Sequence, residues 1–167
     1  MTPAAPLPFR VGHGYDLHRL REGGVLVLGG VAVSTDCSAV AHSDGDVVLH
    51  ATVDALLGAM GWGDIGEYFP DTDPRWKGAA SRVFVEAVMA RVAGAKYSVG
   101  NLDVTVLAER PKLKAFRAQI VRSLAGMLGV APERVNFKAG TNEGCDAIGR
   151  GEAVAAHAVV LLRAHLD

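Results

Sequence analysis

Cysteine is scarce in this 167-residue sequence, which has only Cys37 and Cys145. The two lie far apart and neither belongs to a CxxC pair, so the sequence excludes a disulfide framework and a sulfur-rich zinc site. A long hydrophobic run is also missing, and the first eight residues, MTPAAPLP, lack the cationic and apolar segments of a secretory signal. We therefore expect reduced thiols, a cytoplasmic protein and no membrane partner.

An excess of charge of either sign is missing as well. The formal net charge is −1 and only 21% of the residues are charged, which indicates no basic surface for a nucleic acid. A phosphate-bearing ligand must then be held by local groups. Because a chain of this length buries a sizeable core without cross-links, we predict one domain over residues 9–167, preceded by a flexible tail over residues 1–8.

What is present is a mixture of strand and helix patterns. Short apolar runs broken by glycine predict strands between residues 9 and 33, with a hairpin turn at the Gly-Gly pair of residues 29–30. Apolar residues at helical spacing predict a helix that begins near residues 44–46, and two more over residues 81–95 and 116–128. In the second helix we expect these inward side chains: Val83, Phe84, Ala87, Val88 and Val92.

The second half of the chain supplies further strands, over residues 102–107, 135–138 and the closing run EAVAAHAVVLL. Residues 61–77 combine glycine, proline and aspartate as a long surface loop does. Together the elements predict an α/β protein of the α+β sandwich type, with a single mixed β-sheet and helices packed on one face. The closing strand has alanine, valine and leucine where polar groups would alternate, so we expect sister subunits to cover the open face.

The sharpest chemical signal is Asp16-Leu17-His18 near the end of the first strand, taken with His50 in the first helix. Residues two apart in a strand project to the same face, so Asp16 and His18 can share one ion with His50 as the third ligand. Three protein ligands leave one tetrahedral position open for a phosphate oxygen. Asp54, one helical turn after His50, is predicted to accept a hydrogen bond from its imidazole.

Alone, such a pair has a plainer interpretation, namely a surface Asp-x-His with a core histidine at residue 50. Two further strings argue against it, HSDGDVVLH over residues 42–50 and GDIGEYFPDTDP over residues 63–74. With GYDLH, these strings closely resemble the 2-C-methyl-D-erythritol 2,4-cyclodiphosphate synthase family. HSDGD alone would be a helix cap, and FPDTDP and RPK ordinary turns, so the conclusion rests on their joint presence.

The resemblance implies a reaction and an assembly. The substrate is 4-diphosphocytidyl-2-C-methyl-D-erythritol 2-phosphate, a small-molecule cytidine diphosphate, and the products are the 2,4-cyclodiphosphate and CMP, in the non-mevalonate isoprenoid pathway. Family members are homotrimers with sheets around a central channel and active sites between adjacent subunits. Two residues of this sequence, Arg150 and Glu152, match positions that line the channel, where relatives can hold an isoprenoid diphosphate.

The resemblance also implies roles for individual residues. Asp16, His18 and His50 match the ligands of a Zn²⁺ ion, and Glu143 matches the ligand of a Mg²⁺ or Mn²⁺ ion that bridges the substrate diphosphate. His42 and Thr141 match the catalytic residues that position the phosphates. The positions that match substrate-binding residues are Asp16, Leu17, His18, His42, Ser43, Asp64, Ile65, Gly66, Phe69, Pro70, Asp71, Thr72, Asp73, Ala108, Glu109, Arg110, Pro111, Lys112, Leu113, Lys114, Gly140, Thr141, Asn142, Glu143, Ala147 and Arg150.

Three of these positions differ from the common pattern of the family. Gly140 and Asn142 stand where many members have threonine, and Ala147 stands where an aromatic residue is frequent. Thr141 and Glu143, between and beside them, agree with the pattern. Three other histidines have no partner motif, and we expect them to be structural or exposed: His13, His157 and His165.

The implied chemistry needs no protein nucleophile. A phosphate monoester has its second pKa at about 6, so the attacking 2-phosphate is already largely dianionic at neutral pH. Two other functions use the same ligands: a metal-dependent phosphohydrolase that activates water, and a non-catalytic trimer that binds isoprenoid diphosphates. The product separates them, because only the synthase forms a cyclic diphosphate together with CMP.

Overall fold

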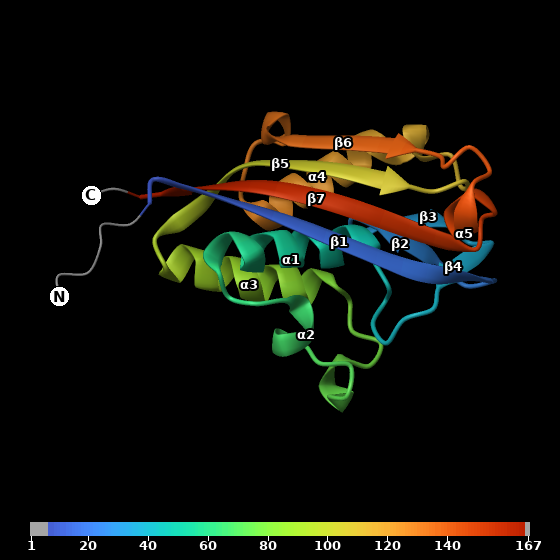
Figure 1. The fold of residues 1–167 in the computed structure, drawn as a ribbon, viewed down its shortest axis with the longest axis horizontal. Coiled ribbons are helices and arrows are strands. Elements are labelled where there is room, and N and C mark those ends of the chain that lie inside the picture. The colour runs from blue at the N-terminus through green and yellow to red at the C-terminus, as the bar shows by residue number, and fades with distance from the viewer. Residues whose placement is uncertain (1–6, 166–167) are drawn as a thin grey trace.

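The computed structural model describes residues 7–165 (Figure 1). The predicted tail falls outside the described residues except for Leu7 and Pro8, and both of these contact the domain. The Leu7 carbonyl accepts a hydrogen bond of 3.0 Å from the Tyr97 hydroxyl, and the Pro8 carbonyl accepts one of 3.0 Å from the Ala164 N–H. Within the described residues no helix is long and apolar enough to cross a membrane.

The core of the fold is a five-stranded mixed sheet in the order β4-β1-β7-β5-β6 (Figure 1). The bounds of its strands are Phe9–Glu22 for β1, Cys37–Ala39 for β4, Tyr97–Leu107 for β5, Val135–Gly140 for β6 and Ala153–Ala164 for β7. Only β5 and β6 are parallel; the other neighbours are antiparallel. The predicted mixed sheet is confirmed.

Three long helices cover one face of this sheet: α1 (Val47–Met60), α3 (Arg82–Gly94) and α4 (Arg117–Leu128). Alternate side chains of the central strand β7, such as Val154 and Val160, are fully buried beneath them. The other face stays open, with Val11, Tyr15 and Leu17 exposed on β1 at 66%, 47% and 43% and Val159 exposed on β7 at 41%. Burial of this face against sister subunits remains a prediction.

Two glycines of β1 let α1 lie directly on the strand. A Cβ atom on Gly12 would stand 1.9 Å from the Ala55 carbonyl oxygen, and one on Gly14 would stand 2.0 Å from that of Ala51. Because Gly12 faces the later turn of α1 and Gly14 the earlier one, the helix runs antiparallel to β1. Its first turn therefore lies over the residues that follow Gly14.

The buried carboxylate of Asp46 fixes where α1 begins. Its Oδ1 accepts the N–H groups of Val48 and Leu49, both at 3.1 Å, as a helix cap does. The same side chain accepts the Gly29 N–H at 2.9 Å and the Gly30 N–H at 2.7 Å. One side chain thus starts the helix at the predicted place and attaches the predicted Gly-Gly turn to it.

That turn joins a separate two-stranded sheet, β2 (Leu26–Leu28) with β3 (Val31–Ser34), so the hairpin is confirmed. It is an addition to the single sheet that the sequence predicted. The long strand β1 takes no part in the hairpin, because its length is paired with β7 and β4.

Two expectations were wrong in detail. The segment 61–77 is not an irregular loop throughout, since it contains the helix α2 (Ile65–Tyr68) and the 3-10 helix η1 (Pro74–Trp76), capped by Asp64 and Asp73. In α3, Val83 and Ala87 are exposed, whereas Val85 is buried beside Phe84 and Val88. The apolar stripe is therefore rotated relative to the predicted one, because residue 85 and not residue 87 faces the core.

The remaining short elements connect the helices and strands. They are η2 (Leu113–Phe116), which leads into α4, η3 (Pro132–Arg134), which leads into β6, and α5 (Asp146–Gly149) within the glycine-rich turn before β7. The predicted helix over residues 116–128 is confirmed, and it ends at Gly129 in the left-handed conformation.

The close approach of β1 and α1 makes a measurable prediction. Gly12→Ala inserts a methyl group into helix backbone, so we expect the free energy of unfolding to fall by about 1–3 kcal/mol or more. Gly126→Ala, in α4 with open space around the new methyl group, is the matched control and should raise the stability by about 0.5–1 kcal/mol. Urea unfolding followed by circular dichroism measures both, and equal stabilities would contradict the proposed packing.

Candidate metal centre and substrate clefts

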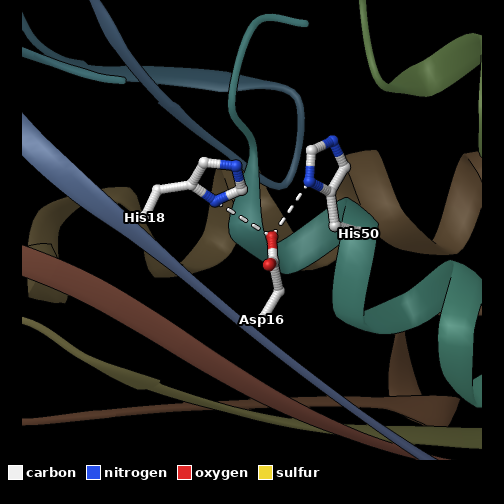
Figure 2. A group of neighbouring side chains, drawn as sticks. All are labelled: Asp16, His18 and His50. Atoms are coloured by element: carbon white, nitrogen blue, oxygen red, sulfur yellow. Dashed lines mark hydrogen bonds and ion pairs between the residues drawn. The ribbon is translucent and has the colours of Figure 1, made fainter. Parts of the chain in front are cut away.

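Asp16, His18 and His50 converge as the sequence predicted (Figure 2). Asp16 and His18 project from β1 toward the helices, and His50 closes the first turn of α1. One ligand atom from each of the three lies within 4.8 Å of the others. The Oδ2 atom of Asp16 is 3.0 Å from His18 Nδ1 and 2.9 Å from His50 Nδ1. Both rings thus turn the same nitrogen toward one carboxylate oxygen.

This donor set suits a divalent cation. His18 Nδ1 is buried and has no hydrogen-bond partner, although it is close to the carboxylate. A buried polar atom without a partner is costly, and a positive charge among the three donors would satisfy it. Two imidazole nitrogens with one carboxylate oxygen are typical ligands of zinc, in a site that keeps a further position open.

The carboxylate itself is held in its charged form. Burial alone raises the pKa of Asp16, but the contacts with His18 and His50 and the charges of their rings outweigh it and lower the pKa to about 2. Asp16 therefore offers a negatively charged oxygen at any ordinary pH.

The outer nitrogen of His50 has a different partner from the one predicted. Its Nε2 lies 2.8 Å from Ser81 Oγ and 3.1 Å from Ser43 Oγ. Asp54 does not take this contact: its Oδ1 accepts the Ile65 N–H at 2.7 Å, at the start of α2. Half-burial raises the pKa of Asp54, and the Ile65 N–H opposes that rise. The expectation for Asp54 was wrong, because the nearby helix terminus binds the carboxylate.

A cleft of about 500 Å³ opens in front of the three donors. Most of the residues predicted to bind substrate in the first half of the chain line it: Asp16, His18, His42, Ser43, Ile65, Gly66, Phe69, Pro70 and Asp71. Ala41, Trp76 and Phe84 complete the wall together with His50. No local motif marks Trp76 or Phe84 as wall residues; Phe84 looks like an ordinary core residue of an amphipathic helix.

An aromatic cluster fixes the outer wall of this cleft. The Phe69 ring stacks on Phe84 of α3 at 4.5 Å between centroids, and Trp76 packs edge-on against both, at 5.3 Å and 5.6 Å. The segment from α2 to η1 is thereby attached to α3 rather than extended into solvent.

A second cavity of about 470 Å³ lies between the start of α4 and the ends of β5 and β6. Predicted residues line it, namely Ala108, Pro111, Lys112, Leu113, Lys114, Gly140 and Thr141. Four further lining residues were not predicted: Arg117, Phe137, Lys138 and Ala139. Lys112, Lys114 and Arg117 bring positive charge to this wall, which suits an anionic ligand, whereas Lys138 forms an ion pair of 2.7 Å with Asp103.

The remaining predicted residues line neither of the two cavities. Leu17 points to the open face of the sheet, opposite its neighbours Asp16 and His18. Neither cavity includes Asp64, Thr72, Asp73, Glu109, Arg110, Asn142, Glu143, Ala147 or Arg150 in its lining. Three of these side chains are paired elsewhere: Asp64 caps α2, Asp73 binds Arg75, and Arg150 forms an ion pair with Glu152.

Within one chain the two cavities do not form one site. The metal donors Asp16 and His18 belong to β1, whereas Thr141 follows β6, and β7 and β5 separate these strands. Three strand spacings of about 4.8 Å place β1 and β6 about 14 Å apart. Glu143 lies with Thr141, whose hydroxyl donates to Glu143 Oε1 at 3.2 Å, and it does not join the three metal donors.

Comparison with known proteins finds relatives that match nearly the whole chain. The 2-C-methyl-D-erythritol 2,4-cyclodiphosphate synthase of Methylococcus capsulatus is 53% identical over 154 residues, which are 92% of this chain and 98% of that protein. The chloroplastic synthase of Arabidopsis thaliana is 49% identical over 160 residues, which are 96% of this chain and 69% of that protein.

The fold agrees as well. A solved structure of IspF from Plasmodium falciparum in complex with CDP superposes with a TM-score of 0.85 at 30% identity, and the match covers 97% of this chain and 100% of that one. The model of the YgbB family matches residues 9–163. The chain therefore belongs to the YgbB family, together with these cyclodiphosphate synthases.

Proposed function

We propose that this protein is a phosphorus-oxygen lyase that converts 4-diphosphocytidyl-2-C-methyl-D-erythritol 2-phosphate to 2-C-methyl-D-erythritol 2,4-cyclodiphosphate and CMP. The observation that carries the proposal is the convergence of Asp16, His18 and His50 on one point at the wall of a cleft. The relatives of the chain carry the name of this synthase, which supports the proposal.

Asp16, His18 and His50 would hold Zn²⁺, which as a Lewis acid polarises a phosphate oxygen when it is bound. Glu143 would hold a Mg²⁺ or Mn²⁺ ion, which would offset the negative charge of the substrate diphosphate. The side chain of Glu143 is exposed and accepts a hydrogen bond from Thr141, which supports a shared role for the two residues at the phosphates.

Ring closure exchanges one phosphorus-oxygen bond for another. An oxygen of the 2-phosphate forms a bond to the β-phosphorus, and the bond from that phosphorus to the oxygen of the α-phosphate breaks, so that CMP leaves with the electron pair. The attacking phosphate is already ionised, and the chain has only to align it and to offset the repulsion between two anions. His42 and Ser43, which line the cleft beside His50, would hold the attacking group.

The second cavity suits the cytidine diphosphate half of the substrate. Lys112, Lys114 and Arg117 give it positive charge, and the backbone of residues 108–114 offers groups that can recognise a base. That the solved structure of the Plasmodium falciparum protein is a CDP complex supports a nucleotide ligand.

A homotrimer would bring the two cavities together. Because β1 and β6 are separated by two strands, the metal donors of one subunit need Thr141 and the cationic wall from a neighbour. The exposed apolar side chains on the open face of β1 and β7 would be buried by such an assembly. Free Cys37 and Cys145 support the cytoplasmic location that we also propose.

The reaction can be followed directly by ³¹P NMR. We expect the protein with magnesium and the cytidine-linked substrate to yield the cyclic diphosphate and CMP. A zinc chelator or His50→Ala should slow this by about 10²–10³-fold or more, because the bound phosphate loses its main electrostatic stabilisation. His165→Ala, an exposed histidine outside both cavities, is the control.

A linear phosphate product would support the phosphohydrolase instead, and binding of an isoprenoid diphosphate without turnover would support the non-catalytic trimer. CMP release at the normal rate from metal-free protein would contradict the role of the three donors.

If the site is shared between subunits, two inactive variants should complement each other in mixed trimers. His50→Ala and Thr141→Ala should each be inactive alone, and Thr141→Ala should still bind nucleotide. Mixed trimers, assembled by refolding both variants together, should regain a substantial fraction of the activity, because some interfaces pair an intact metal site with an intact Thr141. A monomeric mass by light scattering in an active preparation, or no recovery on mixing, would refute the shared site.

The aromatic cluster should stabilise the segment that forms the outer wall of the cleft. Trp76→Ala removes the edge contacts with Phe69 and Phe84, so we expect faster hydrogen exchange in residues 65–76 while the sheet stays protected. Trp62→Ala, which lies in the same segment outside the cluster, is the control. Equal exchange of residues 65–76 in the two variants would show that the cluster does not hold the wall.

A further inference from the structure

A chain of hydrogen bonds runs behind His50, away from the metal donors. His50 Nε2 meets Ser81 Oγ at 2.8 Å, and the Ser81 hydroxyl in turn donates to Asp44 Oδ1. The Ser81 N–H also donates to Asp44, to Oδ2 at 3.1 Å. Ser81 is fully buried at the start of α3, and Asp44 is half-buried two residues before the cap of α1.

The order of donors along this chain follows from the chemistry of its end. A carboxylate can only accept, so the single proton of the Ser81 hydroxyl is used on Asp44. Ser81 Oγ can then only accept from His50, which requires a proton on Nε2. The Ser43 hydroxyl, 3.1 Å from the same nitrogen, offers a second acceptor. With Nε2 protonated, Nδ1 is the nitrogen that can bind an ion.

That nitrogen lies 2.9 Å from Asp16 Oδ2, so in the neutral ring with the proton on Nε2 its lone pair faces the carboxylate. A metal ion between the two atoms would turn this approach into two favourable contacts. Both ring nitrogens of His50 therefore have a defined partner. Nε2 donates to Ser81, which is bound to Asp44, and Nδ1 faces the position of the metal ion.

We propose that Asp44 and Ser81 are positioning residues, which hold His50 in the orientation and the tautomer that present Nδ1 to the metal. The inference rests on the metal assignment in the proposed function, and it gives a role to two side chains that line neither cavity. Partners of this kind orient a metal-binding imidazole and raise its basicity, and their loss weakens metal binding by about 10–100-fold.

Two variants test the two links of the chain. Ser81→Ala removes the nearer of the two acceptors of His50 Nε2 and breaks its link to Asp44. Asp44→Asn reverses the order of donors, because an amide placed to accept the Ser81 N–H turns its own N–H₂ group toward Ser81 Oγ. Ser81 would then donate to His50 Nε2 and favour the tautomer with a proton on Nδ1, where the metal binds.

The measurement is the zinc dissociation constant, obtained by competition with a chromophoric chelator. We expect both variants to bind zinc about 10–100-fold more weakly, and the absorption spectrum of the cobalt-loaded protein to shift. Ser98→Ala, a serine on β5 at a distance from the site, is the matched control and should bind as the parent does. Melting followed by circular dichroism establishes that the variants are folded.

A measurement on the parent needs no variant. In the ¹H–¹⁵N spectrum of the histidine rings of the zinc-loaded protein, we expect the His50 Nε2 proton to be protected from exchange. An unprotected proton there, zinc affinities within about twofold of the parent in both variants, or a loss in Ser81→Ala without one in Asp44→Asn would each overturn the inference. Zinc binding that survives in His50→Ala would instead refute the metal site of the proposed function.

Discussion

The contact between α1 and the glycines of β1 is the constraint on which the rest of the site depends. On the inward face of β1 the side chains run Gly12, Gly14, Asp16 and His18 in alternate positions. The first two admit helix backbone where any side chain would collide with it. Asp16 and His18 lie beyond the N-terminal end of α1. Their longer side chains therefore reach His50, which lies in the first turn of that helix. The glycines that allow close packing and the residues that offer metal donors thus follow one another on the same face of β1.

The first turn of α1 is in turn fixed by carboxylates at its start. Asp46 caps the helix and binds the Gly-Gly turn of the small hairpin, and Asp44 binds both the N–H and the hydroxyl of Ser81. The beginnings of α1 and α3 are therefore connected through polar groups rather than through the apolar core alone. Buried groups of this kind are stabilising only when every partner is present, which makes the position of His50 well defined.

Patterns confined to one element could be predicted from the sequence. The period of two along β1 placed Asp16 and His18 on one face, the helical spacing placed His50, and the polar string before the apolar run placed the helix start near residues 44–46. Ser81 could not be found in this way, because no spacing relates residue 81 to residue 50 and their contact depends on how α3 packs. The prediction for Asp54 failed for the converse reason. Its spacing from His50 was right, but its carboxylate binds the start of α2, a helix in a segment that we expected to be a loop.

The nine residues from His42 to His50 contain a wall residue of the cleft, the acceptor for Ser81, the cap of α1 and a metal donor. Each of these residues contacts a different part of the fold. An insertion or deletion within the segment would therefore move at least one of them away from its partner. Over evolution, this stretch should tolerate some exchanges of side chain but neither insertions nor deletions. Variation in length among related chains should instead collect in exposed connections outside this segment.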